Sequence, residues 1–223
     1  MNAPTLNLVP IFATPFAVVP LALSAETNRS LAAWLTALAT PERRDPGAPA
    51  DAFLFRGRED LFEQQAQPLA ELRNEMLGGL CAAVQAANLY SEAEFAELGV
   101  QIRARLLLVR PDGCVPIESA ALASWRAIYC VAAPAATTGR ADSGTLRLYE
   151  TRFGSMFTDA SNWRLRPPFA PGHHAWRPTP GVMAVFPGPV PHEIALNRAA
   201  GDLVLVSARA RFAHPNQQPP SAW

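Results

Sequence analysis

The spacing of apolar residues changes near residue 100 and divides the chain into a helical first part and a strand-rich second part. In the first part, apolar residues recur at i, i+3, i+4 and i+7, which is the spacing of one helix face. The first such stripe follows a capping residue, Ser24, and contains Leu31, Trp34, Leu35 and Leu38. The second follows Pro68 and contains Leu69, Leu72, Met76, Leu80 and Val84. The pattern predicts two amphipathic helices.

Shorter signals fill in the rest of this first part. Prolines interrupt the apolar residues 6–20, and because proline cannot donate to a sheet, we expect an edge strand in two pieces. Residues 41–52 are polar and proline-rich and predict a loop. The sequence from Ser91 to Glu94 is a capping box and predicts a short third helix that ends at Gly99.

Two adjacent glycines, Gly78 and Gly79, lie in the middle of the second predicted helix. Each costs about 1 kcal/mol relative to alanine in a helix interior. We therefore expect either close packing or a kink at this point.

From residue 100 onward the period becomes that of strands. Apolar and polar residues alternate over 100–108, and further strand-like runs separated by Gly/Pro turns cover 125–131, 144–149, 181–186, 190–196 and 202–212. The connection 154–180 has no clear period and holds His173 and His174, which we expect on a surface loop. Strands that follow helices in this way predict a β-sandwich or barrel with helices packed outside it.

Composition narrows the functional classes. The chain has 223 residues, 49% of them apolar, and no net charge, which argues against a nucleic-acid or membrane-surface partner. All of its basic residues are arginine, so lysine Schiff-base chemistry is excluded. The three cysteines, Cys81, Cys114 and Cys130, have no metal or disulfide spacing. With no membrane-length apolar run and no basic leader at the start, we expect a cytoplasmic protein.

Four stretches together resemble a bacterial family of 2-oxoglutarate/Fe(II) oxygenases. Residues 10–15 (PIFATP) are similar to the opening signature "lFaTP" of this family, and residues 125–131 (WRAIYCV) to its strand "lSGVYYl". Residues 144–152 (GTLRLYETR) resemble "GxLxfxDPR". The most specific match is residues 180–192 (PGVMAVFPGPVPH), which resemble "PxpGxlvlFPswlxH".

The resemblance implies an α+β fold, a double-stranded β-helix (jelly roll) with N-terminal helices packed against it. We expect a single domain over 1–223, in which 1–99 form the edge strand and helices, 100–212 the jelly-roll core, and 213–223 a flexible tail. The resemblance also implies Fe(II) and 2-oxoglutarate as cofactors and a small molecule or peptide as substrate. A homodimer through the proline-rich N-terminal edge is a further expected partner.

The resemblance assigns candidate site residues. His192 aligns with the last histidine ligand of the metal, and Glu118 falls on the first histidine position. Arg209, Arg126 and Tyr129 are the candidates for cofactor binding, and Arg126 replaces a serine of the family's strand, which predicts a changed anion pocket.

The sequence also departs from the family pattern. No histidine precedes His173, and Ala120 stands at the second ligand position. Asp202 lies near the point where an arginine that binds 2-oxoglutarate is expected, about ten residues after the last histidine ligand.

Three hypotheses stay open at this point. The first is an oxygenase in which His192 is the retained iron ligand, completed by Glu118 or a loop histidine. The second is a non-catalytic pseudo-enzyme, a jelly-roll binding or partner protein that has lost the iron site. The third is a cupin-like isomerase or lyase that uses His192 or Tyr129 as acid or base without metal.

Overall fold

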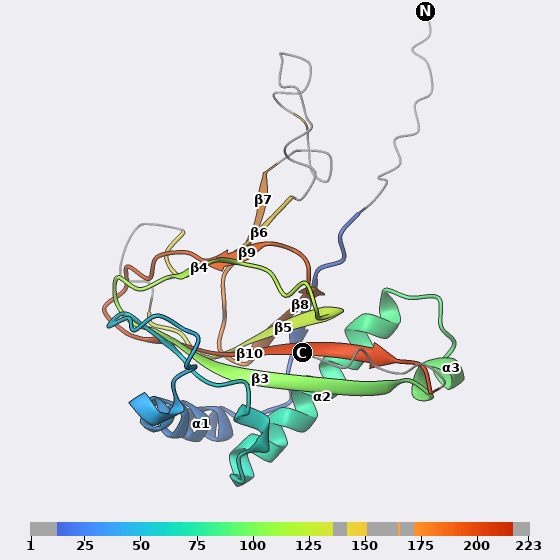
Figure 1. The fold of residues 1–223 in the computed structure, drawn as a ribbon, viewed down its shortest axis with the longest axis horizontal. Helices are drawn as coiled ribbons and strands as arrows, with labels where there is room; N and C mark the ends of the chain where they lie inside the picture. Colours follow the sequence, from blue (N-terminus) through green and yellow to red (C-terminus); the bar gives the residue numbers. More distant parts are fainter. Residues whose placement is uncertain (1–12, 136–141, 151–164, 166–171, 216–223) are drawn as a thin grey trace, which may run out of the picture.

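Ten strands form two antiparallel sheets that face each other in the computed structural model, which describes residues 13–135, 142–150, 165 and 172–215. The large sheet has the order β1 (Ala17–Pro20), β8 (Val182–Pro187), β5 (Trp125–Ala132), β10 (Leu203–Ala213), β3 (Gly99–Val109) and β2 (Leu54–Arg56). The small sheet has the order β4 (Val115–Glu118), β9 (His192–Ile194), β6 (Leu146–Tyr149) and β7 (His173–Trp176). Figure 1 shows the small sheet above the large sheet.

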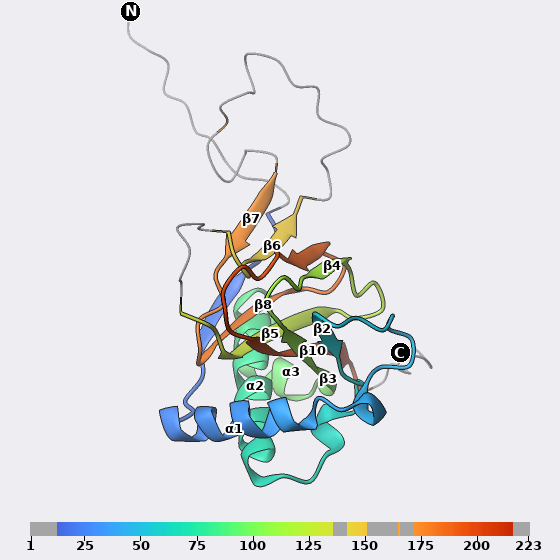
Figure 2. The same ribbon diagram turned by 90° about the vertical axis from the view of Figure 1, so that its left-hand side faces the viewer.

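Helices cover the other face of the large sheet. They are α1 (Ala25–Leu38), α2 (Gln67–Ala86) and α3 (Glu92–Ala96), with the 3-10 turns η1 (Pro41–Arg43) and η2 (Leu61–Glu63) between the first two. Both views place α1 and α2 on the side of the large sheet that is remote from the small sheet (Figures 1 and 2). The result is three layers: small sheet, large sheet and helices.

The caps that the sequence predicts are present. The Ser24 side chain accepts a hydrogen bond from the amide of Thr27 at 3.0 Å, and Ser91 and Glu94 form a reciprocal capping box. These bonds satisfy amides that the first turn of a helix leaves without partners. Such caps explain why α1 and α3 begin where they do.

Much of the large sheet is apolar on both faces because each face adjoins another layer. One core lies between the large sheet and the helices; it includes Leu31, Leu35, Leu72, Met76, Tyr129 and Val206. The other lies between the two sheets; it includes Leu107, Ile128, Phe186, Ile194 and Leu205. Strands buried on both faces have continuous apolar runs rather than clean alternation, which is what β5 and the first half of β10 show.

The predicted fold class, a jelly roll with N-terminal helices packed against it, is confirmed. Three short strands were not predicted. They are β2, β4 and β7, and the last makes the prediction of a continuous connection over 154–180 wrong at residues 173–176. The N-terminal part also contributes more to the large sheet than one edge strand, because β2 joins β3 at the other edge.

Several expectations fall outside the described residues. They concern most of the first piece of the N-terminal strand, most of the connection 154–180 and most of the C-terminal tail. Within the described ranges, no helix is long and apolar enough to cross a membrane.

The glycine pair in α2 marks a close approach of this helix to the large sheet. A Cβ atom at Gly79 would lie 3.0 Å from both the Cε of Met183 and the Cγ1 of Val19. A Cβ atom at Gly78 would meet nothing within 4 Å. Close packing is therefore the reason for Gly79, while Gly78 has no steric reason.

This contrast gives a matched pair of variants. We expect Gly78→Ala to raise the free energy of unfolding by roughly 0.5–1 kcal/mol through helix propensity. We expect Gly79→Ala to lower the free energy of unfolding by about 1 kcal/mol. The added methyl group is overpacked against Met183 and Val19, and this cost is larger than the gain in helix propensity. Urea unfolding followed by circular dichroism measures both, and equal shifts in the two variants would contradict this account of the packing.

Candidate functional site

The face of the large sheet that looks toward the small sheet changes from apolar to charged along the strands. On β10, Leu203 and Leu205 are followed on the same face by Ser207, Arg209 and Arg211. Arg209 lies directly opposite Arg126 on β5 and Arg103 on β3. Like charges at directly opposed positions are destabilising, so this row of arginines requires nearby carboxylates.

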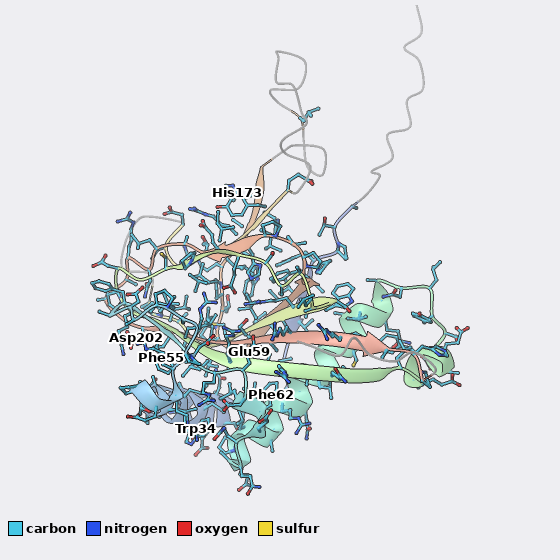
Figure 3. The ribbon with its side chains drawn as sticks, viewed as in Figure 1. Trp34, Phe55, Glu59, Phe62, His173 and Asp202 are labelled. Carbon is cyan, nitrogen blue, oxygen red and sulfur yellow. The ribbon has the colours of Figure 1, made fainter. Side chains whose placement is uncertain are left out.

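Two glutamates pair with arginines of this face. Glu59 pairs with both Arg105 and Arg209, and Figure 3 shows it lying against β3 and β10. Glu118 pairs with Arg126 through one carboxylate oxygen and with Arg56 through the other, the latter at 2.5 Å. We call this second group the Glu118 clamp: the Glu118 carboxylate held between Arg56 and Arg126.

His192 faces the Glu118 clamp from the small sheet. It lies directly opposite Glu118 in the pairing of β9 with β4, and its Nε2 atom is 3.8 Å from Glu118 Oε1. Its Nδ1 atom lies 2.9 Å from the carbonyl oxygen of Val190, so Nδ1 carries the proton and donates to that oxygen. The His192 side chain is 2% exposed, and its ring meets the Phe186 ring edge-on at 5.0 Å. The Nε2 lone pair therefore points into the space beside Glu118.

A tight contact between two turns fixes Glu118 and His192 relative to each other. The amide of Ala120 donates to the carbonyl of Gly188 at 2.8 Å, and the amide of Gly188 donates to the carbonyl of Ser124 at 3.0 Å. A Cβ atom at position 188 would lie 2.4 Å from the carbonyl oxygen of Ala123, so only glycine fits there. The turn before His192 and the loop after Glu118 thus pack backbone against backbone.

The charges around the site set the protonation of its members. Burial raises the pKa of the Glu118 carboxyl, but Arg126 and Arg56 outweigh burial and hold this pKa below its usual value. Burial, followed by the positive charge of Arg126, lowers the pKa of His192 to about 4. Near neutral pH, the site contains an ionised Glu118 and a neutral His192.

The structure brings four of the five predicted site residues together. Glu118, His192, Arg126 and Arg209 all lie between the two sheets. Tyr129 does not join them, because its side chain lies in the core on the helix side of the large sheet. There its hydroxyl donates to Asn28 of α1 at 2.7 Å.

The remaining histidine and acid candidates are also away from the Glu118 clamp. His173 and His174 are exposed on β7, at the edge of the small sheet and two strands away from β9; Figure 3 shows His173 on that outer strand. Asp202 directly precedes β10, at the apolar end of the interior. The described residues contain no group of three or more His, Cys, Asp or Glu side chains that could hold a metal ion.

Sequence reasoning missed two site residues, Arg56 and Glu59. Arg56 ends β2 and lies 62 residues before its partner Glu118. Glu59 follows β2 and lies 46 and 150 residues before its partners Arg105 and Arg209. The one available signal was the charged run Arg56-Gly57-Arg58-Glu59 directly after an apolar pair, which is unusual for a solvated loop.

Comparison with known proteins supports the fold. The chain matches a Pseudomonas putida prolyl-4-hydroxylase with a TM-score of 0.57 and 16% identity, over 89% of this chain and 92% of that one. It matches the non-heme alpha ketoglutarate dependent carbocyclase SnoK from nogalamycin biosynthesis with a TM-score of 0.60 and 9% identity, over 88% and 79% of the chains. HygX from Streptomyces hygroscopicus, solved with nickel and 2-oxoglutarate bound, matches with a TM-score of 0.56 and 12% identity, over 92% and 85%.

No family model matches the chain, and no curated protein matches it by sequence. At these identities the structural matches establish the fold alone: a jelly roll of the kind found in 2-oxoglutarate/Fe(II) oxygenases. The resemblance that the sequence motifs indicated is therefore confirmed for the fold.

Among the described residues, the side chains between the sheets do not fit an iron ion. The 3.8 Å between His192 Nε2 and Glu118 Oε1 would by itself allow one cation to bond to both at about 2 Å. However, each Glu118 oxygen already accepts a hydrogen bond from a guanidinium group, and no third ligand is found among the described residues. Two arginine charges beside one shared carboxylate disfavour a further dication.

Removing the carboxylate from the Glu118 clamp tests how much the clamp contributes to the free energy of unfolding. We expect Glu118→Gln to lower the free energy of unfolding by about 3 kcal/mol, because it leaves the buried Arg126 without its counter-charge. Glu193→Gln is the matched control: its partner Arg147 is 25% exposed, and we expect a loss of about 1 kcal/mol or less. Equal losses in urea unfolding would show that the clamp contributes no more than a surface pair.

The lowered pKa of His192 predicts a dependence of stability on pH. Above the unfolded-state pKa of about 6.5, both states hold a neutral imidazole. As the pH falls from 6.5 toward 4, only the unfolded chain takes up the proton, so the free energy of unfolding decreases, by at most about 3 kcal/mol from this group. His192→Phe should flatten this part of the curve in urea unfolding at pH 7 and 4.5; parallel curves for the two proteins would contradict the burial of a neutral histidine.

Proposed function

We propose that this protein is an iron-independent binding protein on an oxygenase-type jelly roll, corresponding to the pseudo-enzyme hypothesis. The observation that carries the proposal is the Glu118 clamp. The carboxylate that would have to serve as a metal ligand is held on both oxygens by Arg56 and Arg126.

Electrostatics support this proposal. Arg126 is 6% exposed, and a guanidinium group does not give up its proton in a protein. A dication bound by Glu118 would therefore lie close to two guanidinium groups. Those two groups would also lose the Glu118 carboxylate as their counter-charge. At an effective dielectric constant of 20, each pair of unit charges about 4 Å apart repels by about 4 kcal/mol.

The second candidate is a 2-oxoglutarate/Fe(II)-dependent oxygenase that oxidises a small molecule or peptide. One observation favours it: His192 donates through Nδ1 and leaves Nε2 free, which is the arrangement of most metal-bound histidines. In this candidate Fe(II) would be held by His192 and Glu118, and Arg209 would contact 2-oxoglutarate. It requires both arginines to leave Glu118.

In either candidate the partner is a small molecule or peptide that enters between the sheets. A homodimer stays a prediction; it would form through β1, the outermost strand of the large sheet next to β8. A location in the cytoplasm also stays a prediction.

Metal binding separates the two candidates. The purified protein is titrated anaerobically with Fe(II), and separately with Ni(II), in the presence and absence of 2-oxoglutarate. We expect no heat of binding above buffer, no metal-to-ligand absorption band and no metal retained after gel filtration. HygX is the positive control, since it was solved with nickel and 2-oxoglutarate bound.

Retention of one Fe(II) or Ni(II) ion per chain, lost on substituting His192 or Glu118, would overturn this proposal in favour of the oxygenase.

A further inference from the structure

Three polar atoms buried between the sheets have no hydrogen-bond partner among the described residues. They are Arg126 Nε on β5, His192 Nε2 on β9 and Ser207 Oγ on β10. The exposed fractions of these residues are 6%, 1% and 3%. A buried polar group without a partner costs about 1–3 kcal/mol, so three of them in one region indicate a bound molecule that supplies the missing bonds.

The three atoms gather at one place. Arg126 and His192 both approach the same oxygen of Glu118, from the large sheet and the small sheet respectively. Ser207 pairs with Ile128, two residues along β5 from Arg126 and on the same face of the sheet. Diagonal neighbours of this kind lie about 7–8 Å apart, which is within the reach of one small ligand.

The surroundings carry an excess of positive charge. Beside His192, two arginines (Arg56 and Arg126) share the single carboxylate of Glu118. This carboxylate holds both arginines in place, but its one negative charge is set against their two positive charges. An anion is therefore the ligand that this region favours.

The remaining hydrogen-bonding capacity defines the ligand further. Arg126 Nε–H can only donate, so it requires an oxygen that accepts. His192 Nε2 can only accept while Nδ1 donates to Val190, so it requires a hydroxyl group. Ser207 can do either.

Resting on the iron-independent function proposed above, we propose that Arg126, Ser207 and His192 bind a small oxyanion that carries its own hydroxyl group. One ligand oxygen accepts from Arg126 Nε, and the ligand hydroxyl donates to His192 Nε2. Hydrogen phosphate and hydroxycarboxylates share this chemistry. The ligand reaches the site past the side chains of Arg56 and Glu118, which are both 19% exposed, whereas those of Arg126 and His192 are 7% and 2% exposed.

Two pairs of probes test the hydroxyl requirement. The full chain, in a buffer with chelator at pH 7.5, is titrated calorimetrically with inorganic phosphate against sulfate, and with glycolate against acetate. We expect the hydroxyl-bearing member of one pair to bind at least about tenfold more tightly, because the other member leaves His192 Nε2 unpaired. The pair that shows the preference distinguishes a phosphate ligand from a hydroxycarboxylate.

Three variants assign the contacts. Arg126→Lys keeps the charge beside Glu118 but removes Nε–H, and we expect about tenfold weaker binding. Ser207→Ala should weaken binding by a similar factor with little effect on folding. His192→Phe should abolish the preference for the hydroxyl-bearing probe. Arg147→Lys, at an arginine that pairs with Glu193 elsewhere, is the control and should bind like the unchanged protein.

The outcomes separate this inference from the proposed function. Absence of binding by all four probes, equal binding within both pairs, or unchanged binding by Arg126→Lys and Ser207→Ala would overturn the inference, while the iron titration would still stand on its own. Iron bound through His192 and Glu118 would overturn both.

Discussion

The Glu118 clamp joins parts of the chain that are far apart in sequence. Arg56 comes from β2 at one edge of the large sheet, Arg126 from β5 near its centre, and Glu118 from β4 of the small sheet. Its carboxylate gives two buried or half-buried arginines their counter-charge and bridges the two sheets beside His192. In the arginine row across β5, β10 and β3, Glu118 pairs with Arg126 and Glu59 pairs with Arg209.

The jelly-roll fold around the Glu118 clamp does not depend on these ion pairs. The two apolar cores on either face of the large sheet, and the caps of the helices, are sufficient to specify a jelly roll covered by helices on one side. For this reason the fold is shared with 2-oxoglutarate/Fe(II) oxygenases at 9–16% identity, although the charged end of the interior differs from what iron requires. An arginine at position 126 changes the site without changing the strand that carries it.

The sequence predicted the elements that have a long period or a defined cap. The helices α1 and α2 and the strands β3, β5 and β10 belong to this group. At the glycine pair the sequence left close packing and a kink open, and the structure shows close packing at Gly79. The short strands β2 and β4 have three or four residues, too few for a period, so the contributions of Arg56 and Glu59 could not be read from the pattern.

Strand geometry explains the misplaced candidate. Arg126 and Tyr129 are three residues apart on β5, so their side chains point to opposite faces of the sheet and cannot both reach a site between the sheets. Arg126 pairs with Glu118 of the small sheet, and Tyr129 lies in the core on the helix side. Arg126, by contrast, was marked by its charge, because an arginine within a buried strand needs a specific partner.

The most direct test of the central claim is a crystal structure of the protein grown anaerobically with excess Fe(II) and 2-oxoglutarate, with data collected at the iron absorption edge. We expect no anomalous peak between the sheets, and Glu118 still bonded to Arg56 and Arg126. An anomalous peak about 2 Å from both Glu118 and His192, with the two arginines turned away, would contradict it.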